Sequence, residues 1–135
     1  MTSQRGRKEV FYAQGSHAHS SPIPEGVKAG GFVFLSALRG VDPKTQRVEA
    51  DDMEGQARQL FENAKTTLAA AGAGLGDIVK VAVYVTDVSE RAAFNKVWAE
   101  YFPQDPPARF LVQVLDMGVP GDKSKVLCDI TALAP

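Results

Sequence analysis

The last two strands predicted from this sequence are apolar on both faces, and this feature limits the possible folds more than any other. The two segments run from Arg109 to Leu115 and from Lys125 to Leu133. Successive side chains of a strand point to opposite faces of a sheet, and in both segments each alternating set contains large apolar residues. Only two helices are predicted, and two helices cover one face of such a sheet. The other face is therefore expected to pack against another subunit.

The remaining elements follow from hydrophobic periodicity and from turn residues. One amphipathic helix is predicted between a cap at Asp51 or Asp52 and Gly72, and a second between Asp87 and Pro103. Short strands are expected at 8–12 and 32–35 on either side of an irregular loop, 16–31, and a longer strand at 78–85. One face of that longer strand is expected to carry Val79, Val81, Val83 and Val85. This order predicts an α+β fold in one domain, 1–135, with both helices on one face of a mixed sheet.

Composition narrows the functional classes. The 15 basic and 16 acidic residues give a net charge of −1, which provides no electrostatic footprint for nucleic acid or for an anionic membrane. No apolar run approaches the length of a membrane span, and the polar N-terminus lacks the apolar stretch of a signal peptide. A single cysteine, Cys128, cannot form an internal disulfide and favours a reducing compartment. A cytoplasmic protein is expected.

Neither a nucleotide nor a metal ion is expected as a cofactor. The glycine-rich stretch from Gly72 to Gly76 follows a helix and precedes a strand, whereas a phosphate-binding loop follows a strand and opens a helix. His17 and His19 lie in a polar loop without a third ligand nearby in the sequence, so they are interpreted as structural or solvated residues.

Three polar residues on apolar strands are candidates for a functional site. Arg109 opens a strand directly after Pro106 and Pro107, and its planar guanidinium suits a carboxylate or a phosphate. Asp129 lies on the face opposite Cys128 and its apolar neighbours, where it either pairs with a cation or acts as a general acid or base. Ser36 ends a strand, where its hydroxyl could reach a cleft. The pattern alone favours structural roles: an ion pair or a solvated strand-end charge for Arg109, an intersubunit ion pair for Asp129, and a turn or cap hydrogen bond for Ser36.

The sequence resembles the Rid family (reactive intermediate deaminases, YjgF-like) from about Ser21 to Ala134. The segments that carry the resemblance, in order, are Gly31 to Ala37 (GFVFLSA), Gly40 to Pro43 (GVDP), Gln56 to Asn63 (QARQLFEN), Leu68 to Gly72 (LAAAG), Asp77 to Asp87 (DIVKVAVYVTD), Phe94-Asn95 and Pro107 to Arg109 (PAR).

This resemblance implies a chorismate-mutase-like fold and a homotrimer with clefts between subunits. It also implies hydrolysis of imines or enamines of 2-amino acids to 2-oxo acids and ammonia, without a metal or an organic cofactor. Arg109 matches the arginine that binds the substrate carboxylate, and Ser36 and Asn95 match polar residues around the cleft. Asp129 is aligned with a position that usually carries glutamate in deaminating members, where it helps to orient or activate the attacking water.

The chain departs from the family pattern at several of these positions. Ile23 replaces a tyrosine, Ala37 and Leu38 replace glycine and glutamine, and Leu111 stands where cysteine is common. Asp129 is one methylene shorter than glutamate. A pocket with Ile23 and Leu111 among its substrate-binding residues is expected to be more apolar, which suits a larger substrate or indicates a loss of turnover.

Three functions remain open from the sequence. The first is a deaminase of 2-aminoacrylate-type substrates, and the second is a specialised catabolic deaminase, for example of the 2-aminomuconate type. The third is a non-catalytic, trimeric carboxylate-binding or regulatory protein. Some members of the family are described as ribonucleases or translation inhibitors, but the near-neutral charge argues against nucleic acid as the main partner.

Overall fold

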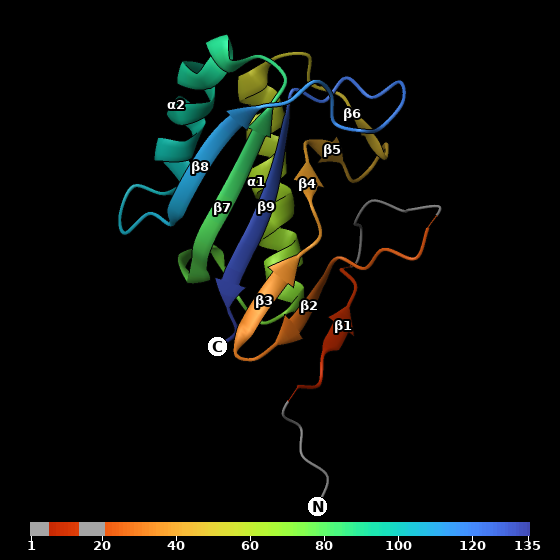
Figure 1. Ribbon diagram of the computed structural model, residues 1–135, viewed down its shortest axis with the longest axis vertical. Coiled ribbons are helices and arrows are strands. Elements are labelled where there is room, and N and C mark those ends of the chain that lie inside the picture. Colours follow the sequence, from red (N-terminus) through yellow and green to blue (C-terminus); the bar gives the residue numbers. More distant parts are fainter. Residues whose placement is uncertain (1–5, 14–20) are drawn as a thin grey trace, which may run out of the picture.

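The computed structural model describes residues 6–13 and 21–135, which form a mixed sheet with two helices packed on one face (Figure 1). The strands of the large sheet are β1 (Glu9–Phe11), β2 (Gly26–Ala29), β3 (Phe32–Leu35), β4 (Leu38–Arg39), β7 (Ile78–Val85), β8 (Ala108–Gln113) and β9 (Val126–Leu133). A separate small sheet pairs β5 (Val41–Asp42) with β6 (Arg47–Val48). The helices are α1 (Met53–Ala70) and α2 (Arg91–Tyr101), with 3-10 turns η1 (Leu75–Asp77) and η2 (Val88–Glu90).

The strand order is β1-β2-β3-β9-β7-β8, with β4 paired to β9 beyond the end of β3. Only β7 and β8 run parallel among these pairs, because α2 connects them as a crossover; the other pairings are antiparallel. Both helices lie behind the sheet in the view of Figure 1. The predicted α+β fold, with two helices on one face of a mixed sheet, is confirmed.

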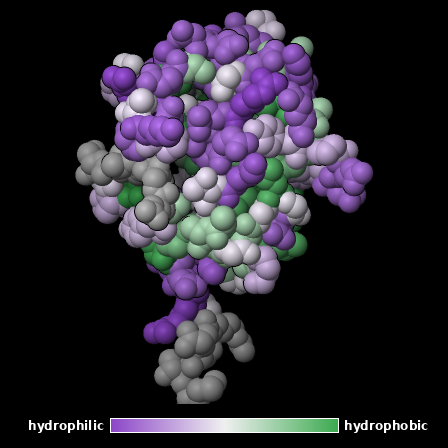
Figure 2. Space-filling model, turned by 180° about the vertical axis from the view of Figure 1, so that it is seen from behind, coloured by the Kyte–Doolittle hydropathy of each residue, from purple (hydrophilic) through white to green (hydrophobic). Residues whose placement is uncertain are grey.

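The core lies between α1, α2 and the central strands. Asp52 caps α1 by accepting a hydrogen bond from the Gly55 N–H, as the sequence predicts. Phe61 is fully buried, and its ring lies within 6.1 Å of four aromatic rings of α2 and its C-terminal end. The inward face of β9 is fully buried and consists of Val126, Cys128, Ile130 and Ala132. Figure 2, seen from the helix side, shows mostly hydrophilic residues over the upper part of the molecule, as expected for amphipathic helices.

Three details differ from the prediction. The loop expected at 16–31 contains strand β2, while 16–20 lie outside the described residues. Gly26 of β2 is required by close packing, since a Cβ there would meet the Phe34 carbonyl oxygen at 2.7 Å. The second helix begins at Arg91, because Asp87 caps the short turn η2 instead. Val79 is exposed and not on the valine face, because the pairing with β9 is irregular between Ile78 and Lys80.

The face of the sheet away from the helices carries large exposed apolar side chains, as the doubly apolar strands predict. We call it the open face. Its residues Phe34, Phe110, Val112 and Leu133 are between 42% and 47% exposed. They come from the three strands β3, β8 and β9, so the apolar surface extends across the sheet.

Candidate functional site

Arg109 is held by α2 at three points. It is the second residue of β8 and faces the helices, because it pairs with the buried Val81 of β7. Its Nη2 donates a hydrogen bond to the Asn95 side-chain oxygen at 2.8 Å. Its Cζ lies 4.8 Å from the centroid of the Trp98 ring and 5.5 Å from that of Phe94. These contacts orient the guanidinium before any ligand binds.

The guanidinium of Arg109 has no carboxylate partner among residues 6–13 and 21–135. Its pKa is lowered, first by burial and second by the positive charge of Arg91, but an arginine so placed remains protonated. A half-buried cation that is held by a neutral amide and two aromatic rings attracts an anion. A structural ion pair, the alternative left open by the sequence, is therefore not formed within the described part of the chain.

Leu111 and Asn95 are the two predicted site residues that lie beside Arg109. Leu111 follows Arg109 by two positions on β8, so it faces the same side, and it packs against the edge of the core. Asn95 is half-buried in the middle of α2. We call Arg109, Asn95 and Leu111 the arginine site; it lies at the β8 edge of the sheet.

Ser36 and Ile23 lie together elsewhere in the sheet. Ser36 directly follows β3, and its hydroxyl donates a hydrogen bond to the Pro24 carbonyl at 2.7 Å. Its N–H donates to the Glu25 carbonyl at 2.9 Å. The serine therefore fixes the segment before β2, where Ile23 is 41% exposed. The structural role considered for Ser36 is present, and its hydroxyl oxygen can still accept a hydrogen bond.

Asp129 lies on the open face, on the opposite side of the sheet from Arg109. It pairs with Ala82 of β7, which in turn pairs with Phe110 of β8. The side chains of Asp129 and Phe110 therefore point to the same face, and Arg109, next to Phe110, points to the other. Asp129 is exposed, and within the described ranges it forms no ion pair.

One chain does not bring all the predicted site residues together. Strands β9 and β7 lie between β3 and β8, so Ser36 is separated from the arginine site by three strand spacings, about 14 Å. Leu38, which stands where the family pattern has glutamine, pairs with Cys128 and packs against the core. Burial raises the pKa of the Cys128 thiol, so this residue is an inert part of the core.

The packing of the Phe94 and Trp98 rings against the Arg109 guanidinium could not be recognised in the sequence. From the sequence, Trp98 is expected only within the second amphipathic helix, and Phe94 also within a segment that carries the family resemblance. The spacing of Arg91, Asn95 and Trp98 at i, i+4 and i+7 places them on one face of α2, so the sequence could have grouped these three residues but could not place Arg109 against them.

Within the part of the chain that the structure describes, no three His, Cys, Asp or Glu side chains come together in a way that could hold a metal ion. His17 and His19 lie outside that part. Among the same residues, neither helix is long and apolar enough to cross a bilayer.

This geometry defines a class of α+β protein with a preorganised arginine at one edge of its sheet and an apolar open face. A sequence model of the family described as Endoribonuclease L-PSP matches residues 16–134. A RutC family protein of Pyrococcus horikoshii is 39% identical over 127 residues, covering 94% of this chain and 97% of the relative. The chain therefore belongs to the Endoribonuclease L-PSP family, which includes the proteins called Rid, YjgF and RutC.

Solved structures agree with this assignment. RidA from the Antarctic bacterium Psychrobacter sp. superimposes with a TM-score of 0.84 at 31% identity, covering 93% of this chain and 98% of that one. The YjgF gene product of E. coli gives a TM-score of 0.84 at 32% identity, with coverage of 94% and 99%. The resemblance noted from the sequence motifs is confirmed at the level of the family.

Proposed function

We propose that this protein is a cofactor-independent deaminase that hydrolyses 2-imino acids, and the enamines in equilibrium with them, to 2-oxo acids and ammonia. The observation that carries the proposal is the state of Arg109. Its guanidinium is oriented by Asn95, Trp98 and Phe94, yet it lacks a carboxylate partner in the described part of the chain. A substrate carboxylate supplies that partner through two parallel N–H···O bonds.

The active unit is a homotrimer with its sites between subunits. The apolar open face supports this assembly, because exposed side chains such as Phe34 and Phe110 gain stability when a second copy covers them. The separation of Ser36 and Asp129 from Arg109 supports shared sites. In this arrangement the β8 edge of one subunit meets Ser36, Ile23 and Asp129 of the partner subunit.

The reaction requires water, one general base and an oriented imine. Arg109 holds the carboxylate, so the imine carbon of the substrate has a fixed position. Asp129 of the partner subunit accepts a proton from water while the water oxygen bonds to the imine carbon, and Ser36 of the partner subunit orients that water. The C–N bond of the resulting carbinolamine then breaks. As water adds, the imine π electrons move to nitrogen, which takes the proton that water released; when the C–N bond breaks, nitrogen takes the hydroxyl proton and leaves as ammonia, and the carbon becomes the carbonyl of a 2-oxo acid.

The non-catalytic alternative uses the same arginine. A trimeric carboxylate-binding protein would be stabilised by 2-oxo acids without turning over imines. The name of the family model also refers to an endoribonuclease, but a net charge of −1 gives no overall electrostatic attraction for RNA. Carboxylate chemistry is therefore favoured over nucleic-acid binding.

A coupled assay tests the proposal. An amino-acid oxidase generates 2-imino acids in solution from several amino acids, and the release of 2-oxo acid is followed with wild type and Arg109→Ala. We expect acceleration by wild type and by the control Arg47→Ala, which removes an exposed arginine of β6. We expect none by Arg109→Ala. If no imino acid is hydrolysed faster with wild type, or if Arg109→Ala matches it, the proposal is wrong.

A further inference from the structure

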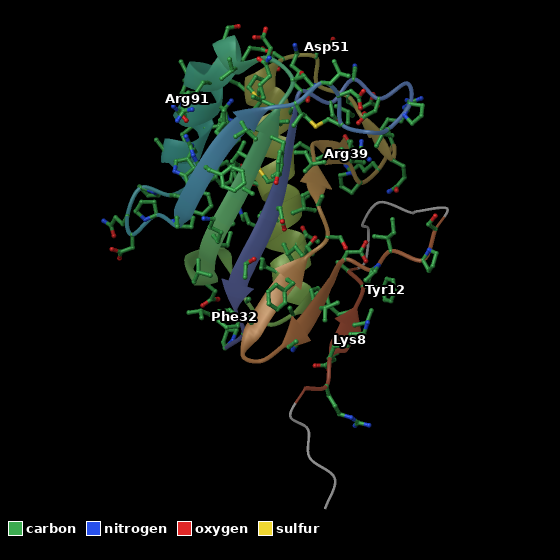
Figure 3. The ribbon with its side chains drawn as sticks, viewed as in Figure 1. Lys8, Tyr12, Phe32, Arg39, Asp51 and Arg91 are labelled. Atoms are coloured by element: carbon green, nitrogen blue, oxygen red, sulfur yellow. The ribbon has the colours of Figure 1, made fainter. Side chains whose placement is uncertain are left out.

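A second arginine lies next to the arginine site and has no role in the proposed reaction. Arg91, which is labelled in Figure 3, is the first residue of α2. Asn95 follows it by one helical turn, on the same face of the helix. The positive charge of Arg91 is close enough to Arg109 to lower the pKa of that residue. The exposed Arg91 therefore lies one helical turn from Asn95, the residue that accepts a hydrogen bond from the Arg109 guanidinium.

Helix stability does not account for an arginine at this position. A cation at the first residue of a helix opposes the helix dipole, and the first turn of α2 contains no acidic residue that could offset it. The adjacent carboxylate of Glu90 forms an ion pair with Lys125 Nζ at 3.3 Å. Asp87 accepts hydrogen bonds from the N–H and the hydroxyl of Ser89.

Arg91 also lacks an ion-pair partner elsewhere in the described ranges, 6–13 and 21–135. Like Arg109, it is a cation without an anion, and the two repel each other. A single ligand with two negative groups offsets both charges at once. About 5.4 Å of helix, one turn, separates Arg91 from Asn95, which binds the Arg109 guanidinium, and this spacing is comparable to that of the carboxylates in a short dicarboxylate.

We infer that the site takes 2-imino dicarboxylic acids, with the carboxylate next to the imine on Arg109 and the distal carboxylate on Arg91. The inference deepens the proposed function and rests on its assignment of Arg109. Leu111 faces the same side of β8 as Arg109 and contacts the methylene chain between the two carboxylates. The substrate class is thus set by Arg91, which contributes binding and selectivity and does not touch the reacting carbon.

Product binding tests this inference separately from turnover. The probes are 2-oxoglutarate and its monocarboxylate analogue 2-oxobutyrate, titrated by calorimetry into the full-length protein. We expect 2-oxoglutarate to bind wild type about tenfold more tightly, as one additional charge pair of roughly 1.4 kcal/mol implies. In Arg91→Gln the affinity for 2-oxoglutarate falls to that for 2-oxobutyrate. Arg109→Gln loses both ligands.

Arg47→Gln is the matched control, since it removes an exposed arginine of the β5–β6 sheet and retains the preference. Equal affinities for the two oxo acids in wild type overturn the inference, as does a preference that survives in Arg91→Gln. A smaller oligomer of Arg91→Gln in sedimentation also overturns it, because Arg91 then pairs with a carboxylate of another subunit. Selective binding of 2-oxoglutarate without imine hydrolysis supports the dicarboxylate site and refutes the proposed catalysis.

Discussion

Changing Asn95 to aspartate tests how Arg109 is used, with almost no change of shape. In Asn95→Asp the oxygen that now accepts from Nη2 at 2.8 Å becomes part of a carboxylate, so the substrate must compete with a built-in anion. Two unit charges about 4 Å apart interact by about 4 kcal/mol at an effective dielectric constant of 20. Partial exposure of Arg109 reduces this to roughly 2–3 kcal/mol.

We therefore expect KM for a 2-imino acid to rise about 100-fold in Asn95→Asp, with a much smaller change in kcat, because the lost interaction is with the bound carboxylate. The free energy of unfolding should not fall, since the new carboxylate pairs with Arg109. Steady-state kinetics in the coupled assay and urea unfolding measure the two quantities. Gln59→Glu on α1 adds the same charge away from Arg109 and should leave the kinetics unchanged. An Asn95→Asp protein with the KM of wild type refutes the carboxylate role of Arg109.

Three further predictions concern stability and assembly. Gln56 is fully buried and forms three hydrogen bonds with backbone groups. Gln56→Leu should therefore lower the free energy of unfolding, measured by urea titration, by about 2–3 kcal/mol. The control Gln59→Leu should lower it much less. Phe110→Glu places a charge on the open face and should convert the proposed trimer to monomers in sedimentation. A trimer that is unchanged by this substitution would place the interface elsewhere. Desolvation and the hydrogen bond to Glu62 raise the pKa of Tyr101 to about 12, from the ordinary value of 10.0. This contribution to stability is complete below pH 10.0 and is lost as the pH rises through about 12, so Tyr101→Phe should unfold with a weaker dependence on pH across that interval.

The fold could be predicted from the sequence wherever local rules and burial agree. The strand Ile78–Val85 has the predicted bounds, and the first helix begins, as predicted, after the cap Asp52. Strand β2 could not be predicted, because it begins with Gly26 and glycine has a low strand propensity. A glycine is needed at this position because the Phe11 ring and the Phe34 backbone leave no room for a Cβ atom. Such tertiary contacts are not visible in a local pattern.

The candidate site could be predicted only in part. Arg109 stands out by its place after two prolines, and strand alternation places Asp129 on the open face. Arg109 and Asp129 lie on opposite faces of the sheet because of the same alternation and the register of β8 and β9 against β7. That register depends on strand pairing and could not be predicted from either strand alone. The role of Trp98 depends on how α2 packs against β8, and no spacing rule within either element determines that packing.

The proposal that each site is shared between subunits is tested most directly by mixing two inactive variants. Arg109→Ala and Asp129→Ala each lack one essential group, and their trimers should be inactive alone. When the two are unfolded together and refolded at equal amounts, about a quarter of the sites in random trimers combine an intact Arg109 with an intact Asp129 from the neighbouring subunit. We therefore predict recovery of about a quarter of wild-type activity in the coupled assay. Mixed trimers as inactive as their parents, or an Asp129→Ala protein as active as wild type, would contradict the shared site.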